Sequence, residues 1–235
     1  MKKSDVRKVI RESLGLDEEE QELNESYVAQ PKSYNLNTEL ILSKTKEAHK
    51  ELYSKYVDSL NHVSAQLDSV DKRMADSSVS DFRSAKINEQ YNLNAVYLHE
   101  LYFANISDPY SEINIDSLSH MRLHRDFGTF DDWQMDFRAC AMSAQNGWAV
   151  CAYSTYLKKY VNMIIDGHNQ QTLVGTYPVI VLDMWEHARR DYLNGKNDYI
   201  RAMMKELNWN VIEERFKRCD FIAQALTSGG KETWA

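Results

Sequence analysis

Two long amphipathic patterns dominate the first half of this chain. From residue 37 to about residue 67, apolar side chains recur mostly at steps of three and four residues, which is typical of a helix with one buried face. A second segment, residues 79–105, has a similar pattern. The polar stretch between the two segments predicts a turn, so the two helices should form a long hairpin.

After Gly147 the pattern changes to that of strands. Three segments are rich in Val, Ile, Tyr and other strand formers: residues 149–157, 160–165 and 178–182. Lys158-Lys159 reads as a tight connection between the first two of these segments. Further helices are expected from Thr129 through Met142, at 198–207 and at 209–219. The expected fold class is therefore α+β, with an N-terminal helical hairpin followed by a mixed half.

Changes in composition divide the chain into three parts. Residues 1–34 are expected to be an N-terminal extension, because a short amphipathic segment after Ser4 is followed by an acidic run. A transit peptide is the alternative interpretation, but the acidic run argues against it. Residues 35–110 are expected to form a helical hairpin domain and residues 111–235 an α/β C-terminal domain. A stretch rich in Pro, Ser and Asp marks the boundary between them.

Charge and cysteine content exclude several classes of protein. The net charge of −7 gives no broad basic surface, so nucleic acid is not an expected partner. No apolar run is long enough for a transmembrane helix, and no secretory signal is visible, so no membrane association is expected. The three cysteines, Cys140, Cys151 and Cys219, are widely spaced and predict reduced packing residues in a cytoplasmic protein.

The candidate chemistry centres on the end of the third strand. Asp183 and His187 lie four residues apart directly after this strand, and such a pair can converge on one metal. His49 and Tyr56 are seven residues apart, so at about 100° per residue they share the buried face of the first helix. His99 lies on the buried face of the second helix. For each histidine, a hydrogen-bonded position in the core is the ordinary alternative.

Several motifs, in one order along the chain, resemble the iron/manganese superoxide dismutase family. Residues 183–188 read Asp-Met-Trp-Glu-His-Ala, which is similar to the family signature Asp-x-Trp-Glu-His-Ala. The other blocks that resemble the family are residues 56–61, 99–103 and 126–131, Gly147-Trp148, Tyr199, Asn208-Trp209 and Arg215. The resemblance implies that the three strands form an antiparallel sheet and that the metal lies between the two halves.

The resemblance also implies an activity and a site. The enzyme would convert superoxide to dioxygen and hydrogen peroxide with one manganese or iron ion per subunit. The implied metal ligands are His49, His99, Asp183 and His187, a nitrogen and oxygen donor set that suits either metal. Tyr56 and Gln170 would be the catalytic residues next to the metal-bound solvent, and Trp148 and Trp185 would pack around the metal. Gln170 matches a glutamine of manganese-type members, which favours manganese.

The resemblance further implies a homodimer, with a tetramer as an alternative. Glu186 would reach across a two-fold interface to the last ligand of a second subunit. At the entrance to the site, Leu52 and Arg190 stand where the family usually has a histidine and a tyrosine, so the entrance should be remodelled.

One spacing departs from the family pattern. The first ligand usually lies eight residues before the tyrosine, whereas His49 lies seven before Tyr56, and an ungapped alignment puts Ala48 at the ligand position. This departure leaves a second hypothesis open, that of a non-catalytic relative acting as a structural or assembly protein. A metal-dependent oxygenase with two histidines and one carboxylate is a weaker alternative, because it leaves one histidine unexplained.

Overall fold

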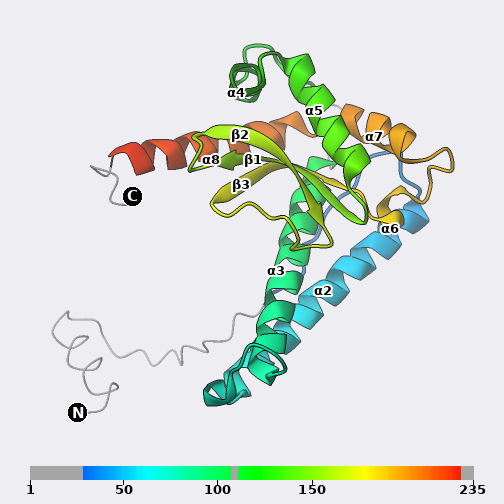
Figure 1. Cartoon of the computed structure of the whole chain (residues 1–235). Coiled ribbons are helices and arrows are strands. Elements are labelled where there is room, and N and C mark those ends of the chain that lie inside the picture. The colour runs from blue at the N-terminus through cyan, green and yellow to red at the C-terminus, as the bar shows by residue number, and fades with distance from the viewer. Residues whose placement is uncertain (1–28, 107–110, 229–235) are drawn as a thin grey trace, which may run out of the picture.

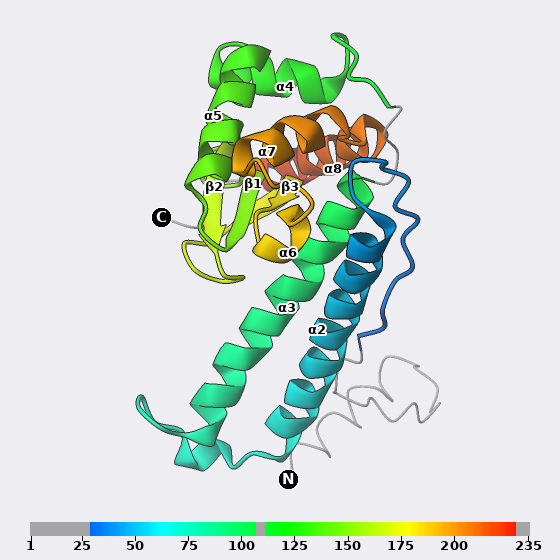
Figure 2. The same cartoon turned by 90° about the vertical axis from the view of Figure 1, so that its right-hand side faces the viewer.

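The computed structural model of the protein describes residues 29–106 and 111–228. The expected helix after Ser4 lies outside the described residues. The two long helices are α2 (Ser43–Ser69) and α3 (Asp81–Asn105), joined through the short 3-10 turn η1 (Lys72–Met74). Figure 2 shows them side by side as an antiparallel hairpin, as the apolar periodicity predicts.

Helix α2 begins later than the expected residue 37. The chain before it is not helical and runs along the hairpin, where Ala29, Leu36 and Ile41 are buried in the main core (Figure 2). Asn61 of α2 holds this segment, because its side-chain amide bonds both the N–H and the carbonyl of Ala29. The last residues of the expected extension, from residue 29 onward, are therefore packed against the hairpin.

The sheet has the order β2-β1-β3, with both pairs antiparallel. Its strands are β1 (Gly147–Ser154), β2 (Lys159–Asp166) and β3 (Thr176–Asp183). All residues of the central strand β1 are buried, which explains its continuous apolar run. Gly147 is required at the start of β1, because a Cβ there would lie 2.0 Å from the carbonyl oxygen of Ile165. This α+β arrangement confirms the expected fold class.

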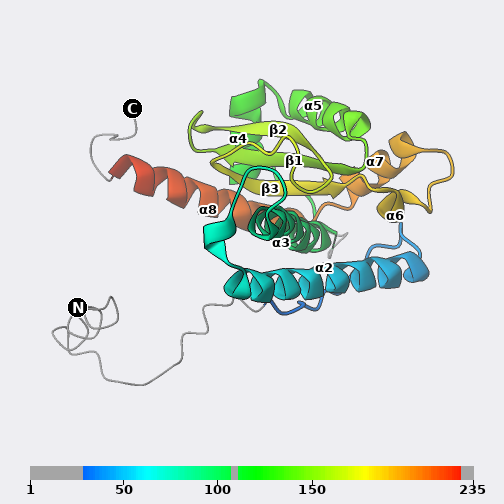
Figure 3. The same ribbon diagram turned by 60° about the horizontal axis from the view of Figure 1, so that its bottom comes forward.

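Helices cover the sheet on both sides. Figure 3 shows α5 (Phe130–Ser143) on one side of the sheet and α3 on the other. The remaining helices are α4 (Leu118–Phe127), α6 (Glu186–Arg189), α7 (Lys196–Lys205) and α8 (Trp209–Ser228). Helix α4 was not predicted; Leu123 is fully buried, and Leu118 and Phe127 also pack against the core. Within the described residues, no helix is both long and apolar enough to cross a lipid bilayer.

Buried side chains from α3 and α8 cover the outer edge of β3. The guanidinium of Arg215 donates to the carbonyl oxygens of Val179 in β3 and Leu101 in α3, each at 3.0 Å. The side-chain amide of Asn105 donates to the carbonyl oxygen of Val181 at 2.9 Å and accepts a bond from Arg215. These bonds satisfy strand carbonyls that have no further strand to pair with, and they attach the hairpin to the sheet.

Candidate metal centre

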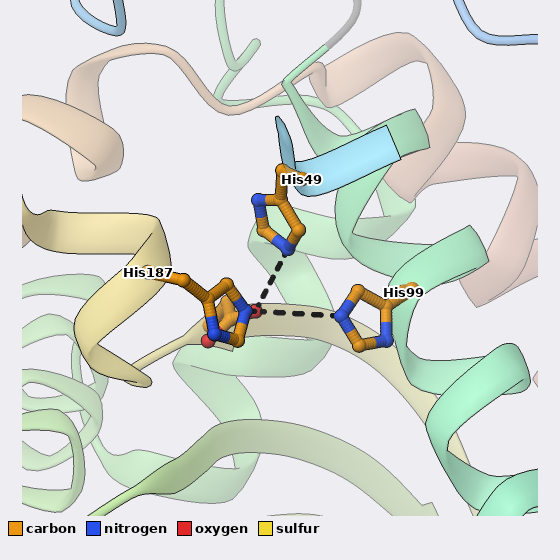
Figure 4. Close-up of side chains that lie close together, drawn as sticks. His49, His99 and His187 are labelled. Atoms are coloured by element: carbon orange, nitrogen blue, oxygen red, sulfur yellow. Dashed lines mark ion pairs between the residues drawn. The ribbon is translucent and has the colours of Figure 1, made fainter. Parts of the chain in front are cut away.

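Four side chains from four different elements converge between the hairpin and the sheet. His49 comes from α2, His99 from α3, Asp183 from the end of β3 and His187 from α6. One ligand atom from each lies within 4.8 Å of the corresponding atoms of the other three. Figure 4 shows the three labelled imidazole rings directed toward one point. The structure thus brings His49, and not Ala48, to the site.

The end of β3 aims two of these side chains by local geometry. Asp183 pairs with Trp148 at the start of the central strand β1 and is fully buried. The backbone N–H of Trp185 donates to Asp183 Oδ1 at 2.8 Å, which leaves Oδ2 facing the imidazoles. This turn starts α6, and the short helix directs His187 back toward Asp183, four residues earlier.

The distances fit ligands around one ion. Asp183 Oδ2 lies 3.2 Å from His49 Nε2, 3.3 Å from His187 Nε2 and 3.9 Å from His99 Nε2 (Figure 4). Ligand atoms that each lie about 2.0–2.2 Å from a common metal are expected to be roughly 3–4 Å apart. Among the described residues these four atoms have no hydrogen-bond partner, although three of the side chains are buried. Buried polar atoms without partners are rare, and one bound cation would satisfy all four at once.

The protonation of His99 strengthens this conclusion. Its Nδ1 lies 2.6 Å from the carbonyl oxygen of Ala95, which can only accept, so Nδ1 carries a proton. Burial lowers the pKa of His99 to about 3, so the ring is neutral and Nε2 presents a lone pair to the cluster. That lone pair faces a carboxylate oxygen of Asp183, and the two repel unless a cation lies between them.

The pKa values of Asp183 and His49 also favour the protonation states that bind a metal. Burial alone would raise the pKa of the Asp183 carboxyl, but the imidazoles of His187 and His49 outweigh it and hold the pKa well below its usual range. Burial also lowers the pKa of His49, which favours the neutral, ligating form. The site thus offers three imidazole nitrogens and one carboxylate oxygen, with no thiolate, a set that suits iron or manganese. These features define a protein with a metal centre of mixed nitrogen and oxygen ligands.

A hydrogen-bonded chain lies beside the cluster. Trp148 Nε1 donates to His168 Nδ1 at 3.0 Å, and His168 Nε2 lies 3.0 Å from the hydroxyl of Tyr56. Because the indole N–H can only donate, Nδ1 of a neutral His168 has no proton and Nε2 carries it. Burial lowers the pKa of His168 to about 4, so the ring is neutral at physiological pH and donates to the Tyr56 oxygen.

His168 was not among the predicted site residues, and it stands where the sequence analysis expected Gln170. The side chain of Gln170 is exposed, and its backbone N–H bonds the carbonyl oxygen of Asp166 in the turn after β2. Gly167, with φ of 60°, begins this turn and is followed by the buried His168. The motif His168-Asn169-Gln170 alone does not show which of its side chains the turn directs into the protein.

The other predicted residues surround the site at different depths. Trp148 is fully buried with its ring centroid 4.9 Å from that of His99, and the half-buried Trp185 stacks on His187 at 6.0 Å. Leu52 is half-buried on α2, whereas Glu186 and Arg190 are exposed. The positive charge of Arg190 is close enough to lower the pKa of His49.

Comparison with known proteins identifies the family of this metal-centre protein. The family model described as iron/manganese superoxide dismutases, C-terminal domain, matches residues 117–215. The chain is 33% identical over 195 residues to an iron superoxide dismutase of Aquifex pyrophilus, which covers 81% of this chain and 91% of the relative. It is 31% identical over 157 residues to a manganese superoxide dismutase of Haloarcula marismortui, covering 65% and 76%. The chain belongs to the iron/manganese superoxide dismutase family, as its motifs indicated.

Proposed function

We propose that the protein is a superoxide dismutase that catalyses 2 O₂•⁻ + 2 H⁺ → O₂ + H₂O₂. The observation that supports this most strongly is the set of four unpartnered ligand atoms from His49, His99, Asp183 and His187 that face one point. An iron or manganese ion bound there would supply the electron transfer by alternating between its +2 and +3 states.

The protein's own residues would hold the ion and handle protons. The ionised Asp183 would balance part of the metal's charge, and the three imidazoles would provide the remaining protein ligands. Tyr56 accepts a hydrogen bond from His168, so its own hydroxyl proton is directed away from that ring. Burial raises the pKa of Tyr56, which keeps the hydroxyl protonated and able to donate. The exposed Arg190 would attract the superoxide anion to the site.

Metal analysis combined with a superoxide-consumption assay on the full chain tests this function. We expect close to one iron or manganese ion per chain, activity that disappears when a chelator removes the ion, and activity that returns on reloading. A folded protein that binds neither metal and does not consume superoxide would instead support the non-catalytic structural role.

The position of Gln170 gives no support for manganese over iron. The Gln170 side chain is exposed, and His168 occupies the position next to Tyr56. Relatives of this chain include both iron and manganese superoxide dismutases. We therefore propose a site for iron or manganese.

Replacing His168 by leucine should lower superoxide consumption by roughly 10- to 100-fold without removing the metal, the range seen when outer hydrogen-bond partners of a metal site are lost. The variant breaks the bonds to Trp148 and Tyr56 but leaves the four ligands in place. His168→Gln keeps a side-chain donor and should recover part of the activity. Gln170→Leu, at the exposed position, is the matched control and should stay within about twofold of the wild type. A larger loss of activity in Gln170→Leu than in His168→Leu would instead assign the catalytic role to Gln170.

We also propose a homodimer held in part by Glu186. This exposed carboxylate adjoins the ligand His187, whose side chain is 22% accessible, so a second subunit can contact both. Glu186→Ala should weaken dimerisation and metal retention together, measured by analytical ultracentrifugation and metal content. Asp58→Ala, at an exposed position on α2, should change neither. A wild type that sediments as a monomer with full metal content would contradict the proposed dimer.

We infer that the protein works in the cytoplasm. Cys140, Cys151 and Cys219 are all unpaired thiols, and Cys151 and Cys219 are buried. Burial raises the pKa of Cys219 to about 11, so this thiol stays protonated and unreactive. Three reduced cysteines fit a reducing compartment.

A further inference from the structure

The helix that carries the first proposed ligand begins without a cap of its own. Leu42, at the N-cap position of the 27-residue helix α2, makes no side-chain capping bond. Its first turn contains no acidic residue. Lys44 and Lys46 also place unfavourable positive charge near the positive end of the helix dipole. Four other α-helices of the described chain have local caps, which are Ser80 for α3, Ser117 for α4, Thr129 for α5 and Asn208 for α8. The free N–H groups at the start of α2 therefore need a partner from elsewhere.

That partner is Asp191, which lies 149 residues further along the chain than Leu42. Its Oδ2 accepts the backbone N–H of Leu42 at 2.9 Å, and its Oδ1 accepts the hydroxyl of Thr45 at 2.8 Å. The neighbouring Tyr192 donates its hydroxyl to the carbonyl oxygen of Leu40 at 2.8 Å. Asp191 thus satisfies the backbone N–H of the N-cap residue and places a negative charge at the positive end of the helix dipole.

The position of this contact relative to the ligands gives it a second consequence. Thr45 precedes His49 by four residues and, like His49, is buried, so both lie on the same face of α2. Asp191 follows His187 by four residues, just beyond α6. The contact therefore links the turn before the first ligand to the segment after the last one. Figure 1 shows α6 next to the start of α2, and the two helices are in contact.

We propose that Asp191 is a positioning residue for the metal centre, which caps α2 from across the fold and fixes His49 relative to His187. Ligand groups must be held to within about 0.5 Å of their productive positions, so a small slip of α2 along its axis would weaken metal binding. Asp191 bonds α2 rather than the cluster, so it acts through the placement of His49. This inference rests on the proposed metal binding at the site.

A cap that only stabilises the fold and a residue that positions a ligand have different signatures. Loss of a simple cap lowers the melting temperatures of the metal-free and the metal-loaded protein by similar amounts. Loss of positioning also reduces the additional stability that the metal confers, because this additional stability depends on metal affinity. Metal affinity and the metal-induced shift in melting temperature therefore separate the two roles without an activity assay.

The experiment compares Asp191→Ala, Asp191→Asn and Thr45→Val with the wild type in the full chain. Manganese-loaded protein is challenged with a competing chelator, and the retained metal and the melting temperatures with and without metal are measured. We expect Asp191→Ala to weaken manganese affinity by roughly 10- to 100-fold, as for other groups that orient ligands, with smaller losses for the other two variants. Thr129→Ala removes the local cap of α5 and is the matched control. It should lower the melting temperature but leave manganese affinity unchanged.

The outcomes separate this inference from the proposed function. If the wild type retains manganese and Asp191→Ala retains it equally well, with the same metal-induced shift in melting temperature, Asp191 is only a helix cap. If the wild type itself binds neither manganese nor iron, the proposed function fails first. Should Asp191→Ala not fold, Thr45→Val provides the same comparison, because it removes only one of the two bonds at Asp191. Unchanged affinity in folded Thr45→Val would then overturn the inference.

Discussion

Replacing His49 by alanine should remove the metal and lower superoxide consumption by roughly 100-fold or more, since even partners outside the ligand set cost 10- to 100-fold. His49 Nε2 is one of the four atoms of the cluster that have no hydrogen-bond partner among the described residues, and it lies 3.2 Å from Asp183 Oδ2. Without it, the site has two imidazoles and a carboxylate. Metal content by elemental analysis and superoxide consumption, measured on the same preparation, test this expectation.

His62 provides the control for this experiment. It lies on the same helix but is exposed, so His62→Ala should keep both metal and activity. If His49→Ala retained full metal content, the one-residue departure from the family spacing would mean that His49 is not a ligand. The half-buried Ala48 has no ligating atom, so the protein would then have a three-ligand site.

Replacing Arg215 by alanine should lower the free energy of unfolding by about 3 kcal/mol, because each buried acceptor left without a donor costs about 1–3 kcal/mol and these costs are not additive. Arg215 is only 9% exposed and donates to Val179, Leu101 and Asn105. Burial lowers the pKa of the guanidinium to about 10, so it remains charged at neutral pH. Urea unfolding of the metal-free protein measures the change.

The nearby Arg218 is the matched control. It is exposed on the same helix and lines the same pocket of about 700 Å³ as Arg215. Arg218→Ala should change the free energy of unfolding by less than about 0.5 kcal/mol, as is usual for surface positions. Equal unfolding midpoints for the Arg215 variant and the wild type would show that water entering from the pocket replaces the guanidinium fully.

Local periodicity was enough to predict much of the fold. The apolar stripes of α2 and α3 and the strand formers around β1 and β3 depend on neighbours within a few residues, so they are visible in the sequence. The same periodicity placed His49 and His99 on buried faces. Their meeting with Asp183 and His187 was implied only by the resemblance to a family, because no local pattern relates residues so far apart.

The features that were missed depend on three-dimensional context. The start of α2 is fixed by Asp191, whose contact with Leu42 could not be inferred from the residues around position 42. The choice between His168 and Gln170 depends on the turn after β2, where Gly167 adopts a positive φ.

The chain order of the contacts around α2 has a consequence for biosynthesis. The proposed ligands lie between residues 49 and 187, and Asp191 follows all of them. A nascent chain that has just exposed His187 has every ligand but lacks the carboxylate that holds the first helix in register. Contacts between such distant segments form late in folding, because the loop between them must close first. Full metal affinity is therefore expected only after the segment that carries Asp191 has been synthesised and has closed onto the start of α2.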